Sequence, residues 1–377
     1  MTTLYMVAGE RSGDRHGAGL LEEMEAIEQG IKVHGLGGVE LRSMASGVED
    51  WVEEAGVVGL VEVLKKYGWF RRKFAATLSE IAALKPDAVI LIDYPGFNLR
   101  LAKALKLAGY PGRIIYYISP QVWAWHRGRI PKMAAILDLM ICIFPFEKSL
   151  YEGCGLRTEF GGHPLVEYHR KRISGVPRDP LLVGLFPGSR RREIVRHMRP
   201  LLDAARRMQA ANPALRFVVS AASEQLAALM DVEVRAADIP GLSIETGTVY
   251  SLMERVSCGA VASGTATLEA AIYGLPHCLI YKVNTGTYVA GRLLVKVPWL
   301  GIVNILAGRE IVRELIQSRC TGSDIAAELT RLRGEDAAAL TDELRTVVDG
   351  LSGDGAYRRA AAFALKMIHA EAVAGSR

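Results

Sequence analysis

The chain has few cysteines and no long apolar run, and each shortage excludes a class of protein. Its five cysteines form no CxxC pair or other zinc-type spacing, and their number is odd. We therefore expect a reduced compartment. No stretch approaches the roughly 18 consecutive apolar residues of a membrane-spanning helix. The N-terminus lacks the basic start of a signal peptide, so we expect a cytosolic protein that at most touches a membrane.

Several cofactor signatures are also missing. Neither half of the chain opens with GxGxxG, which disfavours an NAD-dependent dehydrogenase. No GK[ST] follows the first glycine-rich turn, and no DxD triplet is present to clamp a metal-bound diphosphate. No second histidine or cysteine lies at metal-ligand spacing from His126. We therefore assign no metal and no cofactor.

The composition is that of a globular protein. Of 377 residues, 50% are apolar and 23% are charged, and this length predicts two domains. The 46 basic and 41 acidic residues leave a net charge of +5, too small an excess to indicate nucleic acid as a partner.

Short apolar runs alternate with segments of 3.6-residue periodicity almost from end to end. Runs that are buried on both faces and separated by helices predict βαβ units and a parallel sheet. We expect strands at Leu4–Ala8, Lys32–Gly35, Ala88–Asp93, Arg113–Ile118 and Leu139–Phe144, and in the second half at Leu181–Phe186, Arg216–Ser220, Leu242–Glu245, Gly259–Ala262 and Cys278–Tyr281.

A basic segment without apolar periodicity, Glu167–Pro180, separates the two halves. We predict an α/β protein with two Rossmann-like domains that face a cleft. The first domain covers residues 1–168 and the second covers residues 169–322, and a helical tail follows over residues 323–377. Ligands of such sheets bind at the carboxyl ends of the strands.

A glycine-rich turn with two carboxylates, AGERSGD, follows the first predicted strand. Its polar side chains are Glu10, Ser12 and Asp14. Two carboxylates are unusual in a phosphate cradle, so the turn favours hydrogen bonds to sugar hydroxyls or the orientation of another group. The alternative is that Ser12 or Asp14 caps the next helix.

Another carboxylate, Asp93, ends a buried strand in the segment LIDYPGFN. Burial at a sheet's carboxyl edge would raise its pKa and help it accept a proton from an alcohol. The alternative is an ordinary turn aspartate before Tyr-Pro-Gly.

Aromatic residues follow the next strand in SPQVWAWH, which contains Trp123, Trp125 and His126. Indoles at a strand end can stack on a sugar ring or line an acyl groove. Alternatively, the two tryptophans plug the core between the domains.

In the second half, the strand ending at Phe186 leads into Pro187-Gly188-Ser189-Arg190 and then a helix. Backbone N–H groups, the helix dipole and a guanidinium would converge on one anionic ligand, as holding a leaving diphosphate requires. A solvated basic helix start fits less well, because consecutive arginines at the positive end of a helix need a balancing anion.

Two further segments of the second half carry polar groups. In ASGTATLE, Ser263 and Thr265 can donate to phosphate oxygens and Glu269 can accept from a ribose diol, although plain helix capping is the alternative. In VNILAGRE, Asn304 is compatible with capping the following helix and indicates little by itself.

Taken in order, the segments GERSGD, IDYPGFN, SPQVWAW, FPFEKSLYE, GHP, PGSR, ASGTATLE and NILAGRE resemble the lipid-A-disaccharide synthases, glycosyltransferases of the GT-B type. The similarity runs from about residue 4 to about residue 316. It implies the condensation of UDP-2,3-diacylglucosamine with 2,3-diacylglucosamine 1-phosphate, with inversion, to a β-1,6 disaccharide and UDP. This reaction belongs to lipopolysaccharide synthesis in Gram-negative cells.

The resemblance also assigns roles to single residues. It makes Asp93 the candidate base for the acceptor 6-hydroxyl, and it places Glu10, Ser12 and Asp14 near the acceptor. It matches Arg190 to a diphosphate-contacting arginine. It places the nucleotide side at Gly188, Ser189, Ser263, Gly264, Thr265, Glu269 and Asn304.

Within the N-terminal turn, Arg11 departs from the family's usual small residue, and His16 follows it. The added cation either contacts the acceptor phosphate or points to solvent. The residues specify neither an acyl-chain length nor an oligomeric state.

The segment of residues 57–73 combines aliphatic residues, the pair Trp69-Phe70 and five basic residues. Such a segment suits the bilayer interface, with apolar groups inserted and cations on anionic headgroups. We predict a peripheral contact with the cytoplasmic face of the inner membrane that admits acyl chains, with Trp69, Phe70 and Trp123 on the lipid side. The alternative is an amphipathic helix packed between domains.

Two other functions remain open at this point. A UDP-N-acetylglucosamine 2-epimerase-like enzyme would share the UDP side but would not need lipid. A non-catalytic UDP-sugar or lipid-binding module would bind UDP without any dependence of turnover on Asp93.

Overall fold

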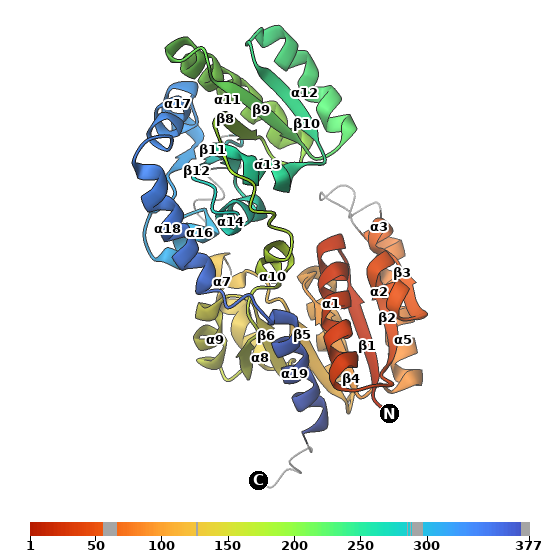
Figure 1. Cartoon of the computed structure of the whole chain (residues 1–377). Helices are drawn as coiled ribbons and strands as arrows, with labels where there is room; N and C mark the ends of the chain where they lie inside the picture. Colours follow the sequence, from red (N-terminus) through yellow and green to blue (C-terminus); the bar gives the residue numbers. More distant parts are fainter. Residues whose placement is uncertain (56–65, 126, 285, 287, 289–296, 371–377) are drawn as a thin grey trace. The chain divides into compact units, whose positions relative to one another are not determined.

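The computed structural model describes residues 1–55, 66–125, 127–284, 286, 288 and 297–370. The chain forms two compact units, Met1–Pro164 with Leu351–Arg377, and Leu165–Gly350. Each unit is built on a parallel sheet of its own (Figure 1).

Within the described residues, the first unit has a seven-stranded sheet in the order β3-β2-β1-β4-β5-β6-β7. All of its strand pairs are parallel. The strands are β1 Thr3–Ala8, β2 Lys32–Gly37, β3 Gly47–Asp50, β4 Ala88–Ile92, β5 Arg113–Tyr117, β6 Leu139–Cys142 and β7 Thr158–Phe160.

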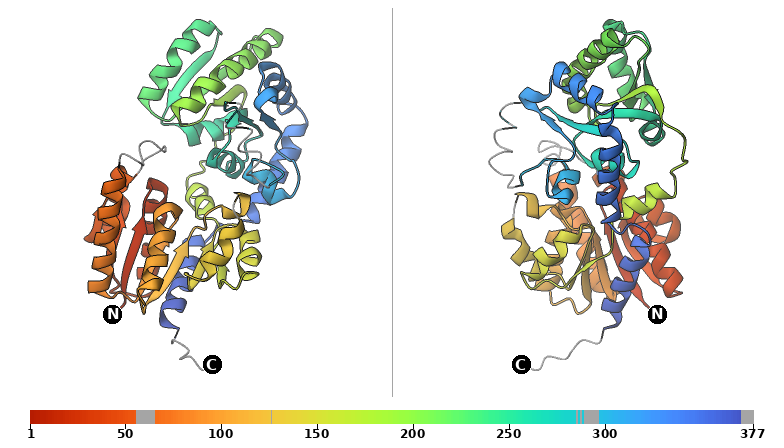
Figure 2. Two further views of the ribbon diagram at one scale, coloured as in Figure 1. Left: turned by 180° about the vertical axis from the view of Figure 1, so that it is seen from behind. Right: turned by 60° about the vertical axis from the view of Figure 1, so that its left-hand side comes forward.

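Helices cover both faces of this sheet (Figure 2). On one face, Val7 and Leu91 pack in a core with side chains of α5 and α6. The next residue of each strand, Ala8 and Ile92, points to the opposite face, where α1 covers it. The helices are α1 Arg11–Ile27, α2 Val39–Met44, α3 Val52–Ala55, α5 Tyr67–Leu84, α6 Pro95–Leu107, α7 Val122–Trp125, η1 Arg127–Arg129, α8 Ile130–Ala134 and α9 Pro145–Glu152. Helix α10, Pro164–Arg170, begins at the last residue of this segment and otherwise belongs to the second unit.

The second unit repeats the scheme with six described strands in the order β10-β9-β8-β11-β12-β13, again all parallel. They are β8 Asp179–Phe186, β9 Arg216–Ala221, β10 Leu242–Thr246, β11 Val256–Ala262, β12 His277–Tyr281 and β13 Glu314–Ile316. Its helices are α11 Arg191–Ala211, α12 Glu224–Ala237, α13 Val249–Arg255, α14 Thr265–Ile272, α16 Ile302–Ala307, η2 Gln317–Arg319, α17 Gly322–Arg331 and α18 Asp336–Asp349.

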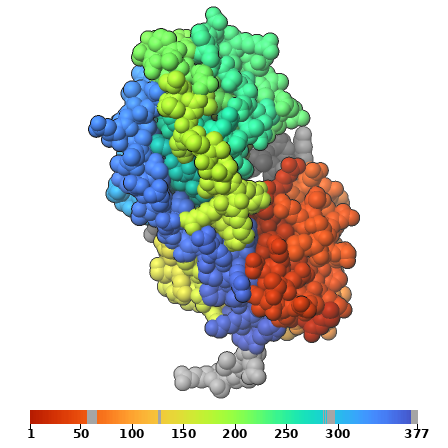
Figure 3. Space-filling view, viewed as in Figure 1, coloured from red at the N-terminus to blue at the C-terminus, as the bar shows by residue number. Residues whose placement is uncertain are grey.

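The predicted helical tail over residues 323–377 is divided between the units. Helices α17 and α18 pack on the second unit, and α19 (Ala356–His369) returns to the first, where it lies beside α1 (Figure 3). The buried His16 of α1 contributes to this return, because its Nδ1 lies 2.9 Å from the hydroxyl of Tyr357 in α19. The break between the units lies at Pro164/Leu165, near the predicted boundary after residue 168.

Among the residues that the structure describes, no helix is both long enough and apolar enough to span a bilayer.

Candidate active site

The strand order of each sheet reverses direction at one position, and the carboxyl edge there is where open α/β sheets bind ligands. In the first unit the reversal lies between β1 and β4, which are followed by Glu10 and Asp93. In the second it lies between β8 and β11, which are followed by Arg190 and Ser263. The predicted site residues therefore lie at the two reversals, each within its own unit.

Asp93 has an unusual backbone. It and Tyr94 both adopt left-handed conformations, with φ of 45° and 49°. Outside glycine this conformation is uncommon and costs free energy, about 1–3 kcal/mol per residue, unless the surroundings enforce it. The surroundings do so here: the carbonyl of Asp93 accepts hydrogen bonds from Asn98 Nδ2 at 2.7 Å and from the hydroxyl of Tyr116. Its N–H donates to Tyr117 O at 3.0 Å.

The Asp93 carboxyl has the acid strength expected of a general base. Burial, and to a smaller extent the negative charge of Glu10, raise its pKa to about 6. A carboxylate that is ionised at neutral pH and still basic enough to take a proton suits catalysis of alcohol attack. Glu10 itself is exposed at the start of α1.

Tyr94 joins the loops after β1 and β4. A Cβ on Gly9 would lie 2.3 Å from Cδ1 of the Tyr94 ring, so the residue before Glu10 must be glycine for the two loops to meet. The tyrosine hydroxyl donates to Ala55 O at 3.0 Å. Tyr94 and Asn98 were not predicted as site residues, although both lie in the segment that carries Asp93.

The carboxylate of Asp14, a predicted catalytic residue, has structural contacts. Its carboxylate is buried and accepts hydrogen bonds from the backbone N–H groups of Gly38, Glu40 and Leu41 at 2.7, 2.9 and 3.1 Å. These are the first amides of α2, so Asp14 caps a helix, but α2 rather than the expected α1.

The other polar residues of this turn lie at the surface. Ser12 is exposed on the first turn of α1. Arg11 is exposed and pairs with Glu53 at 3.3 Å, which fits the solvent-facing alternative.

Trp123 is buried, with 4% of its surface exposed. Its ring packs edge-on against Phe146, with centroids 4.9 Å apart, and its Nε1 donates to Oε1 of Glu147 at 2.9 Å. This favours the alternative of a core residue over a side chain that stacks on a sugar. Trp125 ends α7, and His126 lies outside the described residues.

Glu147, in the FPFE segment, was not predicted as a site residue. It is fully buried and also accepts from the hydroxyl of Ser119 and from Phe144 N. Burial raises its pKa to about 7. It joins the loops after β5 and β6.

The proposed lipid segment is described only from residue 66 onward; its part over residues 57–65 lies outside the described residues. Trp69 and Phe70 are half-buried against the core of the first unit, and Trp69 stacks on Trp51 with ring centroids 6.0 Å apart. The aromatic pair is therefore partly structural.

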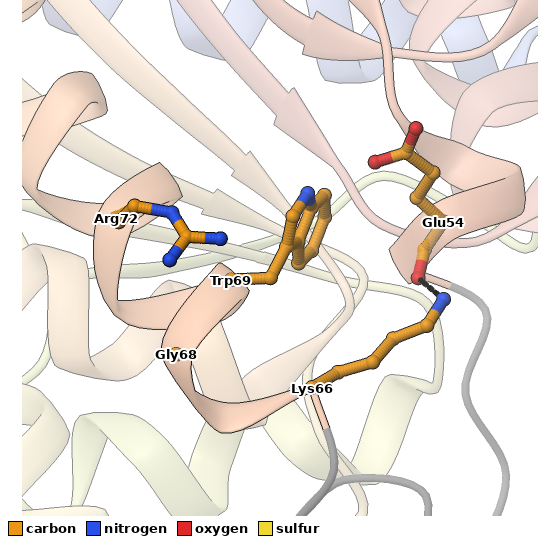
Figure 4. A pocket seen from close by; sticks show the side chains of 5 residues that line it. All are labelled: Glu54, Lys66, Gly68, Trp69 and Arg72. Carbon is orange, nitrogen blue, oxygen red and sulfur yellow. Dashed lines mark hydrogen bonds between the residues drawn. The ribbon is translucent and has the colours of Figure 1, made fainter.

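A pocket of about 410 Å³ lies next to Trp69, lined by Glu54, Lys66, Gly68, Trp69 and Arg72 (Figure 4). Lys66 Nζ donates to Glu54 O at 2.8 Å, and the Arg72 guanidinium points toward the indole. The pocket thus has an aromatic wall beside two cations.

In the second unit, Gly188 precedes the long helix α11 with φ of 107°. L side chains rarely adopt this φ, so the turn favours glycine. Arg190 is exposed, and its Nη1 donates to Glu193 Oε1 at 2.9 Å. The guanidinium therefore pairs with Glu193, which was not predicted as a site residue.

The loop after β11 also lies open at the carboxyl edge. Ser263 is half-buried and donates its N–H to Ile280 O at 3.0 Å, whereas Gly264 and Thr265 are exposed. Glu269 accepts from the Tyr250 hydroxyl at 3.2 Å and lies 3.6 Å from Nε2 of the buried His169. The Oε1 atom of Glu269 therefore interacts with Tyr250 and His169.

The side chain of Asn304 is buried and hydrogen-bonded within the second unit. It is 1% exposed and lies inside α16, so it does not cap that helix. Its amide donates to Val312 O and Glu314 Oε1 at 2.7 and 2.9 Å, and its oxygen accepts from Ile311 N and Val312 N. It holds the segment between α16 and β13, and the nucleotide contact expected of Asn304 stays a prediction.

The fold and the two carboxyl-edge sites define the class of two-Rossmann, GT-B-type enzymes. The chain is similar in structure to a UDP-N-acetylglucosamine 2-epimerase from Neisseria meningitidis, with a TM-score of 0.63, 12% identity, and coverage of 97% of this chain and 100% of that chain. It is also similar to a calicheamicin glycosyltransferase, with a TM-score of 0.59, 14% identity and 98% coverage of both chains. At these identities the likeness shows the fold, and it confirms the predicted fold class.

Sequence comparison identifies the family. The model of the lipid-A-disaccharide synthetase family matches residues 4–366. A lipid-A-disaccharide synthase of Syntrophus aciditrophicus is 40% identical over 97% of both chains, and one of Trichlorobacter lovleyi is 38% identical over 97% of both. This chain belongs to the lipid-A-disaccharide synthetase family, as its ordered segments predicted.

Proposed function

We propose that this chain is an inverting glycosyltransferase that condenses UDP-2,3-diacylglucosamine with 2,3-diacylglucosamine 1-phosphate. The products are the β-1,6-linked disaccharide 1-phosphate of lipid A biosynthesis and UDP. The family match over residues 4–366 carries the proposal. The raised pKa of Asp93 at the carboxyl edge of its sheet supports it chemically.

In this mechanism Asp93 accepts the proton of the acceptor 6-hydroxyl. The hydroxyl oxygen forms a bond to the anomeric carbon as the bond from that carbon to the diphosphate breaks, and UDP leaves with the electron pair. Attack opposite the leaving group inverts the anomeric centre. Glu10 is the neighbouring charge that keeps Asp93 basic, because it raises the pKa of that carboxyl.

The second unit binds the nucleotide in this proposal. The backbone N–H groups of the Gly188–Arg190 turn and the guanidinium of Arg190 stabilise the charge on the departing diphosphate. Ser263, Gly264, Thr265 and Glu269 complete the nucleotide side, the first three being half-buried or exposed after β11. In the bound state, Arg190 exchanges its contact with Glu193 for the diphosphate or shares it.

We further propose that the reaction needs no metal or other cofactor, because the arginine and the amides supply the positive charge that a metal would otherwise bring. Among the described residues, no group of three or more His, Cys, Asp or Glu side chains is arranged to hold a metal ion.

The two substrates are lipids, and we propose that the chain meets them at the cytoplasmic face of the inner membrane. Tyr67 is 60% exposed, and Lys66 and Arg72 flank the pocket beside Trp69. Exposed aromatic and cationic groups together favour an anionic bilayer interface.

The test is UDP release by the purified protein with both lipids in detergent and with EDTA present. Release that requires both lipids is the expected result. Release that stops in EDTA would contradict the metal-free mechanism. Absence of release, combined with conversion of UDP-N-acetylglucosamine to its 2-epimer, would replace the proposal with the epimerase function. UDP binding without turnover on any of these substrates would leave a binding module.

A further inference from the structure

A buried histidine of α11, His197, contacts two loops at the carboxyl edge of the second sheet. It is 0% exposed, and its Nδ1 lies 2.8 Å from the carbonyl oxygen of Pro187. On the opposite side of the ring, the backbone N–H of Lys282 donates to Nε2 at 3.0 Å. The imidazole therefore joins the loop after β8 to the residue that follows β12.

These two partners allow one protonation state. A carbonyl only accepts, so Nδ1 must carry a proton, and a backbone N–H only donates, so Nε2 must not. The neutral Nδ1–H tautomer satisfies both contacts. A second proton at Nε2 would face the Lys282 N–H and break that contact.

His197 contacts the residue directly before the proposed diphosphate-binding loop, so its two hydrogen bonds can fix the orientation of that loop. Pro187 directly precedes Gly188, Ser189 and Arg190, whose orientation the proposed diphosphate site requires. Strand β11 lies between β8 and β12 in the sheet, so the histidine spans the strand that leads into Ser263. A Cβ on Gly188 would lie 3.4 Å from Cβ of Ala262, so the Gly188 turn lies close to the end of β11.

We propose that His197 is a positioning residue that holds the Gly188–Arg190 loop in its ligand-binding form, and that its protonation weakens the binding of a nucleoside diphosphate. The proposal rests on the proposed function for its ligand. It does not place His197 in contact with that ligand.

The electrostatic surroundings fit this role. Burial lowers the pKa of His197, the hydrogen bond to Pro187 and the charge of Glu193 oppose that shift, and the charges of Arg196 and Lys282 add to it. The net direction keeps the ring neutral at pH 7 and allows protonation only in acid. Since an unfolded histidine titrates near pH 6.5, the stability that the neutral ring contributes is present above that pH and is lost as the pH falls below it.

Two substitutions separate the two contacts. In H197N the amide nitrogen replaces Nδ1 and keeps the donation to Pro187, but the acceptor for Lys282 is lost. In H197Q the amide oxygen replaces Nε2 and keeps the acceptor for Lys282, but the donation to Pro187 is lost. H277N is the matched control: His277 is also fully buried, its Nδ1 contacts Leu275 O at 2.7 Å, and it begins β12, away from the carboxyl edge.

The experiment measures UDP affinity by calorimetry from pH 5 to pH 8, and amide hydrogen exchange of residues 186–193 without ligand. In H197Q we expect faster exchange of these residues, and UDP binding at pH 7.5 that is weaker by roughly 3- to 10-fold, as loss of one hydrogen bond predicts. H197N permanently loses the contact with Lys282 that protonation would break, so it should bind UDP at pH 7.5 about as weakly as the wild type does in acid, and its affinity should not fall further as the pH drops. H277N should match the wild type in both measurements.

The results distinguish an error in the role of His197 from an error in the proposed function. If the wild type binds UDP and both His197 variants keep its exchange rates and its pH profile, the role of His197 is wrong and the proposed function stands. If loop exchange rises in H197Q but the wild type binds no UDP at any pH, the nucleotide part of this inference and the proposed function are both overturned.

Discussion

The side-chain amide of Asn98 donates to the main-chain carbonyl of Asp93 at 2.7 Å, and to that of Ile92 at 3.2 Å. Asn98 is fully buried on the first turns of α6. The hydrogen bond from Asn98 stabilises the left-handed backbone of Asp93, whose φ is 45°, at the carboxyl edge of the sheet. A buried amide on the following helix thus orients the candidate base.

Replacing Asp93 should separate chemistry from nucleotide binding. We expect Asp93→Asn and Asp93→Ala to lower turnover by about 10²- to 10⁴-fold, the usual contribution of a general base, while the Kd for UDP stays unchanged. UDP release and calorimetry measure the two effects. Loss of UDP binding together with turnover would contradict the assignment of nucleotide and base to different units.

The backbone at Asp93 gives a control for these variants. Glycine tolerates a left-handed conformation that alanine does not, so Asp93→Gly should be more stable to denaturation than Asp93→Ala, by about 1 kcal/mol. Both variants lack the carboxylate, so both should be inactive. Equal turnover by Asp93→Gly and the wild type would show that the carboxylate has no catalytic role.

The pH dependence of the reaction should report Asp93. Burial first and Glu10 second raise the pKa of this carboxyl to about 6. The base acts only when ionised, so kcat/KM should fall as the pH drops through about 6. Glu10→Gln removes one raising charge and should move this acid limb to lower pH, though not to the range of an exposed aspartate, because burial remains. An acid limb that stays in place would remove Glu10 from the site.

Asp14→Ala should affect folding more than chemistry. Three backbone N–H groups at the start of α2 lose their acceptor, which costs on the order of 2 kcal/mol of unfolding free energy. Asp14→Asn keeps one acceptor oxygen and should lie between alanine and the wild type. Turnover per folded molecule should fall far less than in Asp93→Ala. A Tm equal to that of the wild type with a collapse in turnover would restore the catalytic interpretation.

Asn304→Ala should likewise act through stability. It leaves Ile311 N and Val312 N without their acceptor and removes one of the two donors to Glu314 Oε1, at a cost of about 2–4 kcal/mol. Well below the lowered Tm, the Kd for UDP should be close to that of the wild type. Weaker UDP binding with an unchanged Tm would instead indicate direct contact with the nucleotide.

Charge removal at the pocket beside Trp69 should weaken membrane binding. Each basic residue near an anionic surface contributes about 1 kcal/mol, so K66S/R72S should bind phosphatidylglycerol vesicles at least tenfold more weakly in a flotation assay. K32S/K103S removes the same charge from exposed positions of the same unit and should bind nearly as the wild type does. Equal losses in the two double variants would indicate attraction by net charge alone.

Most of the sheets could be predicted because their central strands are continuous apolar runs. The predicted Leu4–Ala8 is observed as Thr3–Ala8, and Ala88–Asp93 as Ala88–Ile92. The missed strands are short: β3, β7 and β13 have four, three and three residues and lie at sheet edges. An edge strand is paired on one side only and tolerates polar residues such as Glu49 and Glu159, so it carries little apolar signal.

By itself, the sequence determined the alternating α/β fold, the family and the loops that hold the candidate site, because these depend on apolar periodicity and on the order of short segments. Only the tertiary structure decided which polar side chains in those loops face solvent and which face backbone. Asp14 and Asp93 are both carboxylates at strand-to-helix turns, yet one caps a helix whose first amides lie 24 to 27 residues away. The other is held open at the sheet edge by Asn98. Hydrogen bonds between groups far apart in the chain leave no local pattern, so their partners appear only once the chain has folded.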